Sequence, residues 1–222
     1  MRYTALALAA TLAACSTKQE KTVDSAAGRM PADTDVAAQG SGVPSGYAAV
    51  TDDSTAKLTS IRYATRDGSW EVTTGPAHIV FAARDTASGN YTASATFTQL
   101  EAPHHPEAYG IFVGGRNLQS PSRAYTYFLV RGNGQFLVKS PEGANTKDVI
   151  AWTPNAAVPK ADSSGHGTYR LAVRVAADSV RFMVNDKQVG AVKAGTVATD
   201  GVAGLRVNHN LHVRTAPITI TR

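Results

Sequence analysis

Apolar and polar residues alternate along most of the chain beyond about residue 58. In the segment from Asn90 to Thr98, every second residue is apolar: Tyr91, Ala93, Ala95 and Phe97. The residues between them carry hydroxyl groups. A two-residue period with one apolar face predicts a half-buried antiparallel β-strand, and no segment shows the period of an amphipathic helix. Similar segments recur at residues 69–73, 78–83, 108–114, 125–131, 135–139, 148–152, 168–175, 180–184, 187–192, 202–208 and 211–220.

The connections between these segments have the composition of tight turns. Gly132-Asn133-Gly134 separates two apolar segments, and Asn185-Asp186-Lys187 and Ala177-Asp178 occupy comparable places. Such residues favour β-hairpins because they tolerate the backbone angles of two-residue turns. About a dozen short strands at this spacing predict a two-sheet antiparallel jelly-roll sandwich over residues 47–222.

The N-terminal segment has the parts of a secretory signal. Arg2 precedes a short apolar run that ends in Leu12-Ala13-Ala14-Cys15, and Cys15 is the only cysteine. The run is too short for a permanent membrane span. Residues 1–14 therefore resemble a bacterial lipoprotein signal peptide, which implies cleavage before Cys15, acylation of its thiol and a membrane anchor. Ser16 in place of Asp implies the outer membrane of the cell envelope. The alternative is a free thiol in an ordinary signal peptide.

Residues 15–46 predict a disordered tether behind the acylated cysteine. The stretch is rich in small and polar residues and shows no sustained period, so it buries too little apolar surface to offset its ordering entropy. A flexible chain of about 30 residues spans roughly 30 Å. The formal net charge is +5, and the basic residues are spread without a run. A nucleic-acid partner is therefore not expected.

The order of the predicted strands resembles the concanavalin A-like lectin/glucanase superfamily over about residues 65–222. It is most similar to the bacterial branch described as 3-keto-disaccharide hydrolase or family 16 glycoside hydrolase-related. The segments on which this resemblance rests are Gly68–Thr73, Asn90–Phe97, Glu107–Gly115, Tyr125–Phe136, Tyr169–Val175, Val180–Asp186 and Gly201–Val207. Retaining glucanases of this superfamily place carboxylates as Glu-x-Asp-x-x-Glu on one strand, and this chain has no such run.

Histidines and a carboxylate form the candidate catalytic set. His104, His105 and Glu107 lie within four residues, and His209 and His212 form a second pair near the C-terminal strands. Such groups can supply acid/base chemistry or bind a divalent metal, although no cofactor is required by any motif. Adjacent histidines on an extended chain point to opposite sides, so only one of the first pair faces a given site. The alternative is a solvated loop.

Tyr125, Tyr127 and Arg131 share one face of a predicted strand, and Tyr109 joins them if its own strand lies alongside. With Arg116 they form the candidate ligand-binding set, because aromatic rings cover the apolar surface of a sugar while polar neighbours bind its hydroxyl groups. The alternative is half-buried packing. Trp70 and Trp152 are expected in the core, with a sugar-binding platform as the alternative.

Three functions remain open for this lipid-anchored domain. The first is a non-catalytic module that binds carbohydrate or a related envelope ligand through the candidate ligand-binding set. The second is a glycan-acting hydrolase that uses His104, His105, Glu107 and His209. The third is a structural envelope domain. The binding module is favoured because it requires only a surface complementary to its ligand. The hydrolase requires a set of catalytic residues that the spacing of the candidates does not show.

Replacing Cys15 by Ser should abolish acylation, because the hydroxyl group does not replace the thiol as the acyl acceptor. The domain should then be released, or an uncleaved precursor should accumulate. Metabolic labelling with an alkyne-tagged fatty acid checks this on the full chain. Label retained by the Cys15→Ser variant would contradict the assignment.

Overall fold

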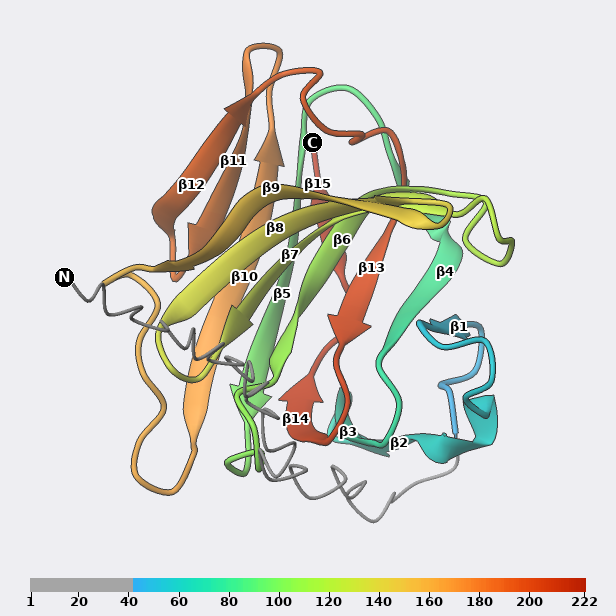
Figure 1. Cartoon of the computed structure of the whole chain (residues 1–222), viewed down its shortest axis with the longest axis vertical. Coiled ribbons are helices and arrows are strands. Elements are labelled where there is room, and N and C mark those ends of the chain that lie inside the picture. Colours follow the sequence, from blue (N-terminus) through green and yellow to red (C-terminus); the bar gives the residue numbers. More distant parts are fainter. Residues whose placement is uncertain (1–41) are drawn as a thin grey trace, which may run out of the picture. The chain divides into compact units, whose positions relative to one another are not determined.

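The computed structural model describes residues 42–222, which form an all-β fold (Figure 1). The signal segment, Cys15 and the tether up to residue 41 lie outside the described residues. Within residues 42–222 there are fifteen strands and one short 3-10 turn, η1 (Leu58–Ser60). None of the helical structure in this part of the chain has the length and hydropathy needed to cross a bilayer.

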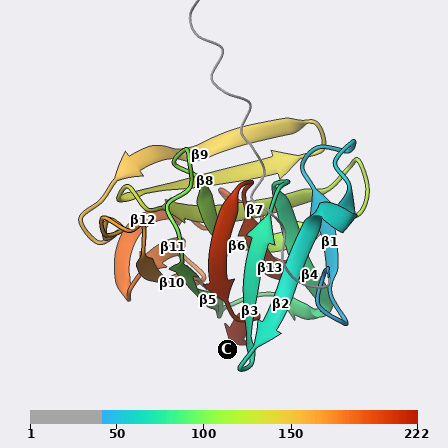
Figure 2. The same ribbon diagram turned by 90° about the horizontal axis from the view of Figure 1, so that it is seen from below.

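The strands form two antiparallel sheets, as predicted (Figure 2). Sheet A has the order β1 (Ala48–Thr51), β4 (His78–Ala87), β13 (Gly201–Val207), β6 (Ala108–Arg116), β7 (Ala124–Arg131), β8 (Gln135–Glu142), β9 (Asn145–Pro154). Sheet B has the order β12 (Lys187–Lys193), β11 (Ser179–Val184), β10 (Gly167–Val175), β5 (Tyr91–Gln99), β14 (Leu211–Thr215), β3 (Ser69–Thr74), β2 (Ile61–Arg66), with β15 (Thr219–Thr221) also paired to β5.

The predicted hairpins are confirmed by the register. Arg131 pairs with Gln135 across the Gly132–Gly134 turn. Val184 pairs with Lys187, and Asn185 and Asp186 between them have φ angles of 48° and 64°. Two positive φ angles in a two-residue loop match the right-handed twist of the flanking strands. The predicted strand at 211–220 is wrong as a single element, because it divides into β14 and β15.

The main core lies between the two sheets. The alternation of β5 is confirmed: its apolar phase is buried, and its threonines and serine face outward. Trp70 is also in this core, where its ring meets those of Tyr47 and Tyr63 edge to face. Residues 42–46, predicted in the tether, contact the same core. Val43 packs against it, and the Gly42 carbonyl accepts a hydrogen bond from the Tyr63 amide at 3.1 Å.

Strands β6 and β7 are buried on both faces. Every residue of β6 except Arg116, and every residue of β7 except Arg131, is buried. The prediction of half-buried strands is therefore wrong for this pair. Side chains on the face turned away from sheet B form a second apolar group, which we call the outer cluster. Its buried members are Ile79, Phe81, Ala108, Phe112, Leu118, Tyr125, Tyr127, Leu129 and Leu137.

Gly204 is required where two rings of the outer cluster meet. In the register it lies between Phe81 and Phe112, whose ring centroids are 6.3 Å apart. A Cβ atom at this position would lie 2.5 Å from the Val80 carbonyl oxygen and 2.6 Å from the Phe112 ring. Because Gly204 has no side chain, the Phe81 and Phe112 rings can pack against each other across β13.

Candidate functional site

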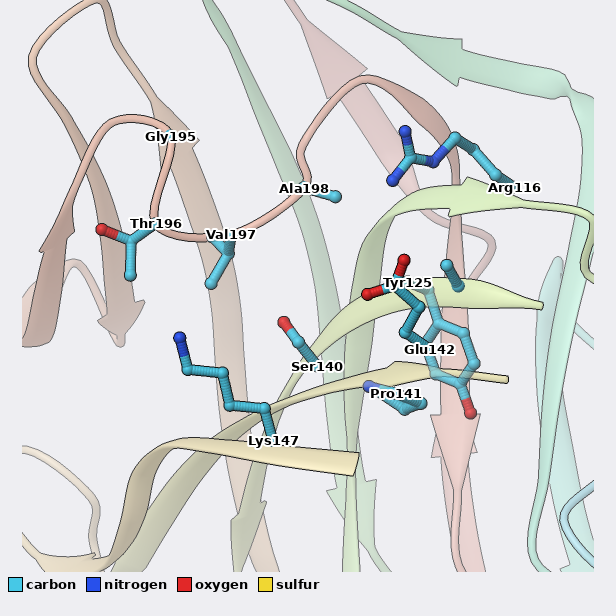
Figure 3. Close-up of a pocket in the computed structure, with 11 residues that line it drawn as sticks. Arg116, Tyr125, Ser140, Pro141, Glu142, Lys147, Gly195, Thr196, Val197 and Ala198 are labelled. Atoms are coloured by element: carbon cyan, nitrogen blue, oxygen red, sulfur yellow. The ribbon is translucent and has the colours of Figure 1, made fainter. Parts of the chain in front are cut away.

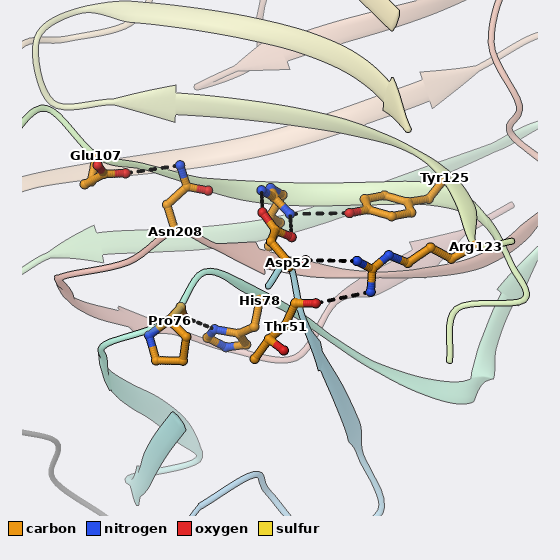
Figure 4. Close-up of polar contacts among 9 residues, drawn as sticks. Thr51, Asp52, Pro76, His78, Glu107, Arg123, Tyr125 and Asn208 are labelled. Atoms are coloured by element: carbon orange, nitrogen blue, oxygen red, sulfur yellow. Dashed lines mark hydrogen bonds and ion pairs between the residues drawn. The ribbon is translucent and has the colours of Figure 1, made fainter. Parts of the chain in front are cut away.

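A partly buried ion pair between Asp52 and Arg206 lies on the outer face of sheet A; Figure 4 shows Asp52 and its neighbours. The Arg206 side chain, on β13, is 7% exposed, and the Asp52 side chain, just after β1, is 43% exposed. Nη1 donates to Oδ1 at 2.8 Å and Nη2 to Oδ2 at 2.5 Å. Burial alone would raise the pKa of Asp52, but its hydrogen bonds and the charge of Arg206 hold that pKa below the usual value. Both groups are therefore charged at neutral pH.

Arg123 fixes the position of Asp52. Its Nη1 donates to the Thr51 carbonyl at 3.1 Å, and its Nη2 donates to the Asp52 carbonyl at 3.2 Å. These bonds hold the end of β1 against β7, since Arg123 immediately precedes β7. The hydrogen bonds from Arg123 thus hold the backbone at Asp52 in place, and its carboxylate lies in position to bind Arg206.

Tyr125 and Tyr127 lie on the predicted shared face, but their rings are packed within the outer cluster. They are 4% and 8% exposed. The Arg206 guanidinium lies 4.5 Å from the Tyr127 ring centroid, and its Nη1 donates to the Tyr125 hydroxyl at 3.4 Å. Burial raises the pKa of both phenols. These contacts support the packing alternative over an open stacking surface for a ligand.

Tyr109 does not join Tyr125 and Tyr127, so that part of the expected set is wrong. Tyr109 pairs with Val130, whereas Tyr127 pairs with Phe112, and the two-residue period sends Tyr109 to the inner face. Its ring is fully buried there, 5.4 Å from the Phe97 ring centroid, and its hydroxyl donates to Gln99 Oε1 at 3.3 Å.

One end of the outer face brings together residues from both predicted sets. Arg131 stacks over the Trp152 ring at 4.0 Å and donates to Gln135 Oε1 through Nε at 2.9 Å. Trp152 is partly buried against the outer cluster rather than in the main core. We call this region the Arg131 end; its members are Glu107, Arg131, Gln135, Trp152, Asn208 and His209.

Glu107 and His209 meet at the same end. The Glu107 Oε1 atom lies 3.2 Å from His209 Nε2, and Oε2 accepts a hydrogen bond from Asn208 Nδ2 at 3.2 Å. The contact forms because Asn208 directly follows β13 and its amide bonds to the Ala108 carbonyl on β6. The charge of Glu107 also acts on Arg131, whose pKa is lowered by burial and partly restored by that carboxylate. A pocket of about 420 Å³ adjoins this end and includes Asn133, which donates to Gln135.

The other predicted histidines lie apart from this contact. His104 is exposed and His105 partly exposed in the loop before β6, and neither imidazole makes a hydrogen bond or ion pair within residues 42–222. His212 lies on sheet B between Glu71 and Glu101, with each ring nitrogen 2.9 Å from a carboxylate oxygen. No group of three or more His, Cys, Asp or Glu side chains suited to a metal ion occurs in the described part of the chain.

Arg116 lies in a separate pocket of about 450 Å³ (Figure 3). Gly114 and Gly115 form a β-bulge in β6, and the register shifts between Val113 and Arg116. The shift removes Arg116 from the row that contains Tyr127 and Arg131. The five ligand-binding candidates thus divide among the inner core, the outer cluster, the Arg131 end and this pocket.

Sequence reasoning missed Asp52, Arg206, Asn208 and Gln135. Arg206 occupies the outward phase of a strand, where a charged residue is ordinary, and Asp52 precedes the segments that alternate clearly. Asp52 and Arg206 come together only because β4 pairs with β1 on one side and with β13 on the other.

The fold is a concanavalin A-like and galectin-like jelly-roll sandwich. The carbohydrate binding module CBM66 from Bacillus subtilis is similar, with a TM-score of 0.57 and 12% identity over 83% of this chain and 99% of that one. A Bacillus subtilis protein of unknown function with a galectin-like fold gives a TM-score of 0.59 and 12% identity over 78% and 88%. The Emp46p carbohydrate recognition domain, in its potassium-bound form, gives 0.52 and 11% over 79% and 88%. No protein-family model and no curated protein matches the chain.

Asp52→Asn should destabilise the domain by about 2–4 kcal/mol, because it leaves a buried guanidinium without its counter-charge. Arg206→Met should cost less, since the half-exposed carboxylate that remains can be hydrated. The double variant should resemble Arg206→Met alone. Urea unfolding of the three variants measures the order, and an Asp52→Asn variant no less stable than Arg206→Met would contradict it.

His78 should make stability depend on pH. Its Nδ1–H donates to the Pro76 carbonyl at 3.1 Å (Figure 4), so Nε2 accepts from the Tyr63 hydroxyl at 2.7 Å. Burial lowers its pKa to about 4. Below pH about 6.5 this histidine binds a proton in the unfolded chain but stays neutral in the folded chain. The free energy of unfolding therefore falls by on the order of 3 kcal/mol as the pH drops toward 4.

The stability difference between the wild type and His78→Asn should accordingly shrink from pH 6.5 to pH 4. Chemical denaturation at several pH values measures it. The control, His104→Asn, alters an exposed imidazole and should keep the wild-type profile. A constant difference between wild type and His78→Asn over this range would refute the assignment.

Proposed function

We propose that this chain is a lipid-anchored carbohydrate-binding module of the bacterial cell envelope, with its glycan site at the Arg131 end of the outer face. The site is supported by the convergence of Glu107, Arg131 and His209, three residues selected from sequence, beside a partly exposed Trp152. The fold is shared with a carbohydrate-binding module and a carbohydrate recognition domain. The anchor rests on the sequence Leu12–Cys15, and its placement at the outer membrane rests on Ser16.

The chemistry of the Arg131 end suits a sugar. The Trp152 ring offers an apolar surface to the C–H groups of a pyranose, and Arg131 keeps that ring in place by stacking on it. Glu107 accepts hydrogen bonds, Arg131 donates them, and the amides of Gln135 and Asn208 do both. A neutral glycan requires this mixture of donors and acceptors around a ring, rather than a concentration of one charge.

A glycan hydrolase is the second candidate, favoured by the 3.2 Å contact between Glu107 and His209. A carboxylate beside an imidazole can transfer a proton to or from a bound substrate. In this alternative the Arg131 end remains the glycan site, and only the roles of Glu107 and His209 change.

Glycan-array binding followed by calorimetry on the full chain tests the proposal. Trp152→Ala and Arg131→Gln should each weaken the best glycan about tenfold or more, as removal of a central aromatic or arginine contact does. Lys187→Gln, on the far edge of sheet B, is the matched control and should bind normally. Melting temperatures of all variants establish that they are folded.

Each outcome assigns one function. Turnover of a bound glycan that Glu107→Gln abolishes while binding persists would identify the hydrolase. Absence of binding and turnover across a broad panel would refute the glycan site and favour a structural domain. Binding that survives both Trp152→Ala and Arg131→Gln would place the glycan elsewhere on the molecule.

A further inference from the structure

The pocket that contains Arg116 is distinct from the Arg131 end. It lies between the ends of β6 to β9 and the loop that joins β12 to β13 (Figure 3). The lining residues are Arg116, Ala124, Tyr125, Ser140, Pro141, Glu142, Lys147, Gly195, Thr196, Val197 and Ala198. None of them belongs to the Arg131 end, and a volume of about 450 Å³ lies within the range of small-ligand sites.

The loop that joins β12 to β13 is held in place by contacts with the strands beneath it. The pocket is therefore formed before any ligand binds. Thr126 Oγ1 bonds to the Ala198 carbonyl and to Ser140 Oγ, each at 3.0 Å. At the bulge, Gly114 has a φ angle of 67°, and a Cβ there would lie 2.4 Å from the Ala198 carbonyl oxygen. The backbone of β6 therefore supports the loop directly, and the opposite walls keep a fixed separation.

Three charged side chains converge on the pocket without pairing to one another. Figure 3 shows Arg116 and Glu142 on the side of the pocket near Ala198, and Lys147 on the other side, directed toward Thr196 and Val197. Within residues 42–222 these three side chains form no ion pair and no hydrogen bond. Elsewhere on the sheet, Lys139 and Asp148 do pair, at 3.0 Å. All three side chains are exposed, so the pocket presents two cations and one carboxylate to solvent and to a ligand that enters it.

We propose that this pocket binds the carboxylate of an acidic sugar unit, such as a uronate. The guanidinium of Arg116 matches a carboxylate in two parallel hydrogen bonds, and Lys147 adds a second positive charge. Glu142 can only accept hydrogen bonds, so the ligand must offer hydroxyl groups beside its carboxylate. Ser140 and Thr196 supply further hydroxyl partners. A simple inorganic anion satisfies the cations but not Glu142, and a neutral sugar leaves both cations unpaired.

Isothermal titration of the full chain with glucuronic acid, and with glucose as the neutral counterpart, tests this site. Glucuronate should bind at least about tenfold more tightly than glucose, because hydrogen bonds between charged groups are the stronger ones. Arg116→Gln and Lys147→Gln should remove that preference, and added salt should weaken it. Glu142→Gln should reduce glucuronate binding less than Arg116→Gln. Lys187→Gln, on the far edge of sheet B, is the matched control and should be unchanged.

Equal affinity for glucuronate and glucose, or an Arg116→Gln variant that binds glucuronate like the wild type, would overturn the proposal. Full competition by equimolar acetate would overturn the sugar part, since acetate lacks hydroxyl groups. Arg131→Gln removes a side chain of the other proposed site, and the preference for glucuronate over glucose should persist in it. Failure of this pocket is therefore distinguishable from failure of the glycan site at the Arg131 end.

Discussion

The positive charge of Arg206 is the constraint on which the outer face of sheet A depends. A guanidinium that is 7% exposed cannot remain among aromatic rings without a counter-charge and hydrogen-bond acceptors. Asp52 provides both, and Arg123 fixes the backbone that presents it. The edge strand β1 is thereby joined to β13 and β7, which are not its neighbours in the sheet. One buried charge thus ties together strands that the backbone ladder alone leaves apart.

The same ion pair explains why the rings of the outer cluster are packed rather than open. Arg206 covers the face of Tyr127 and reaches the hydroxyl of Tyr125, so neither ring forms an open stacking surface for a sugar. At the Arg131 end the stacking pair is Arg131 on Trp152, and there the ring remains partly exposed. The two arginine–aromatic pairs of sheet A therefore differ. The pair of Arg206 and Tyr127 is enclosed by neighbouring strands, whereas the ring of Trp152 stays accessible beside Arg131.

The strand pattern, the hairpins and the two-sheet architecture could be predicted from sequence because each depends on local alternation and turn chemistry. The shared face of Tyr125, Tyr127 and Arg131 followed from the same period. The error at Tyr109 arose from register, which no single strand encodes: a shift of one residue between β6 and β7 exchanges the two faces. The bulge at Gly114 likewise separated Arg116 from its predicted neighbours. The contact of Glu107 with His209 joins residues about a hundred positions apart and required the tertiary pairing of β13 with β6.

The edge strands of the two sheets, β1, β9, β12 and β2, determine whether crowded copies of the domain can pair edge to edge. Strand β1 is only four residues long, and β2 carries Arg62 and Arg66. Strand β9 is irregular in its pairing and ends at Pro154, and β12 begins at Lys187 and ends at Lys193. Long, flat and apolar edges join between molecules, whereas short, charged or kinked edges do not. The backbone is thus protected against edge-to-edge aggregation, and copies can be concentrated on a surface without fusing their sheets.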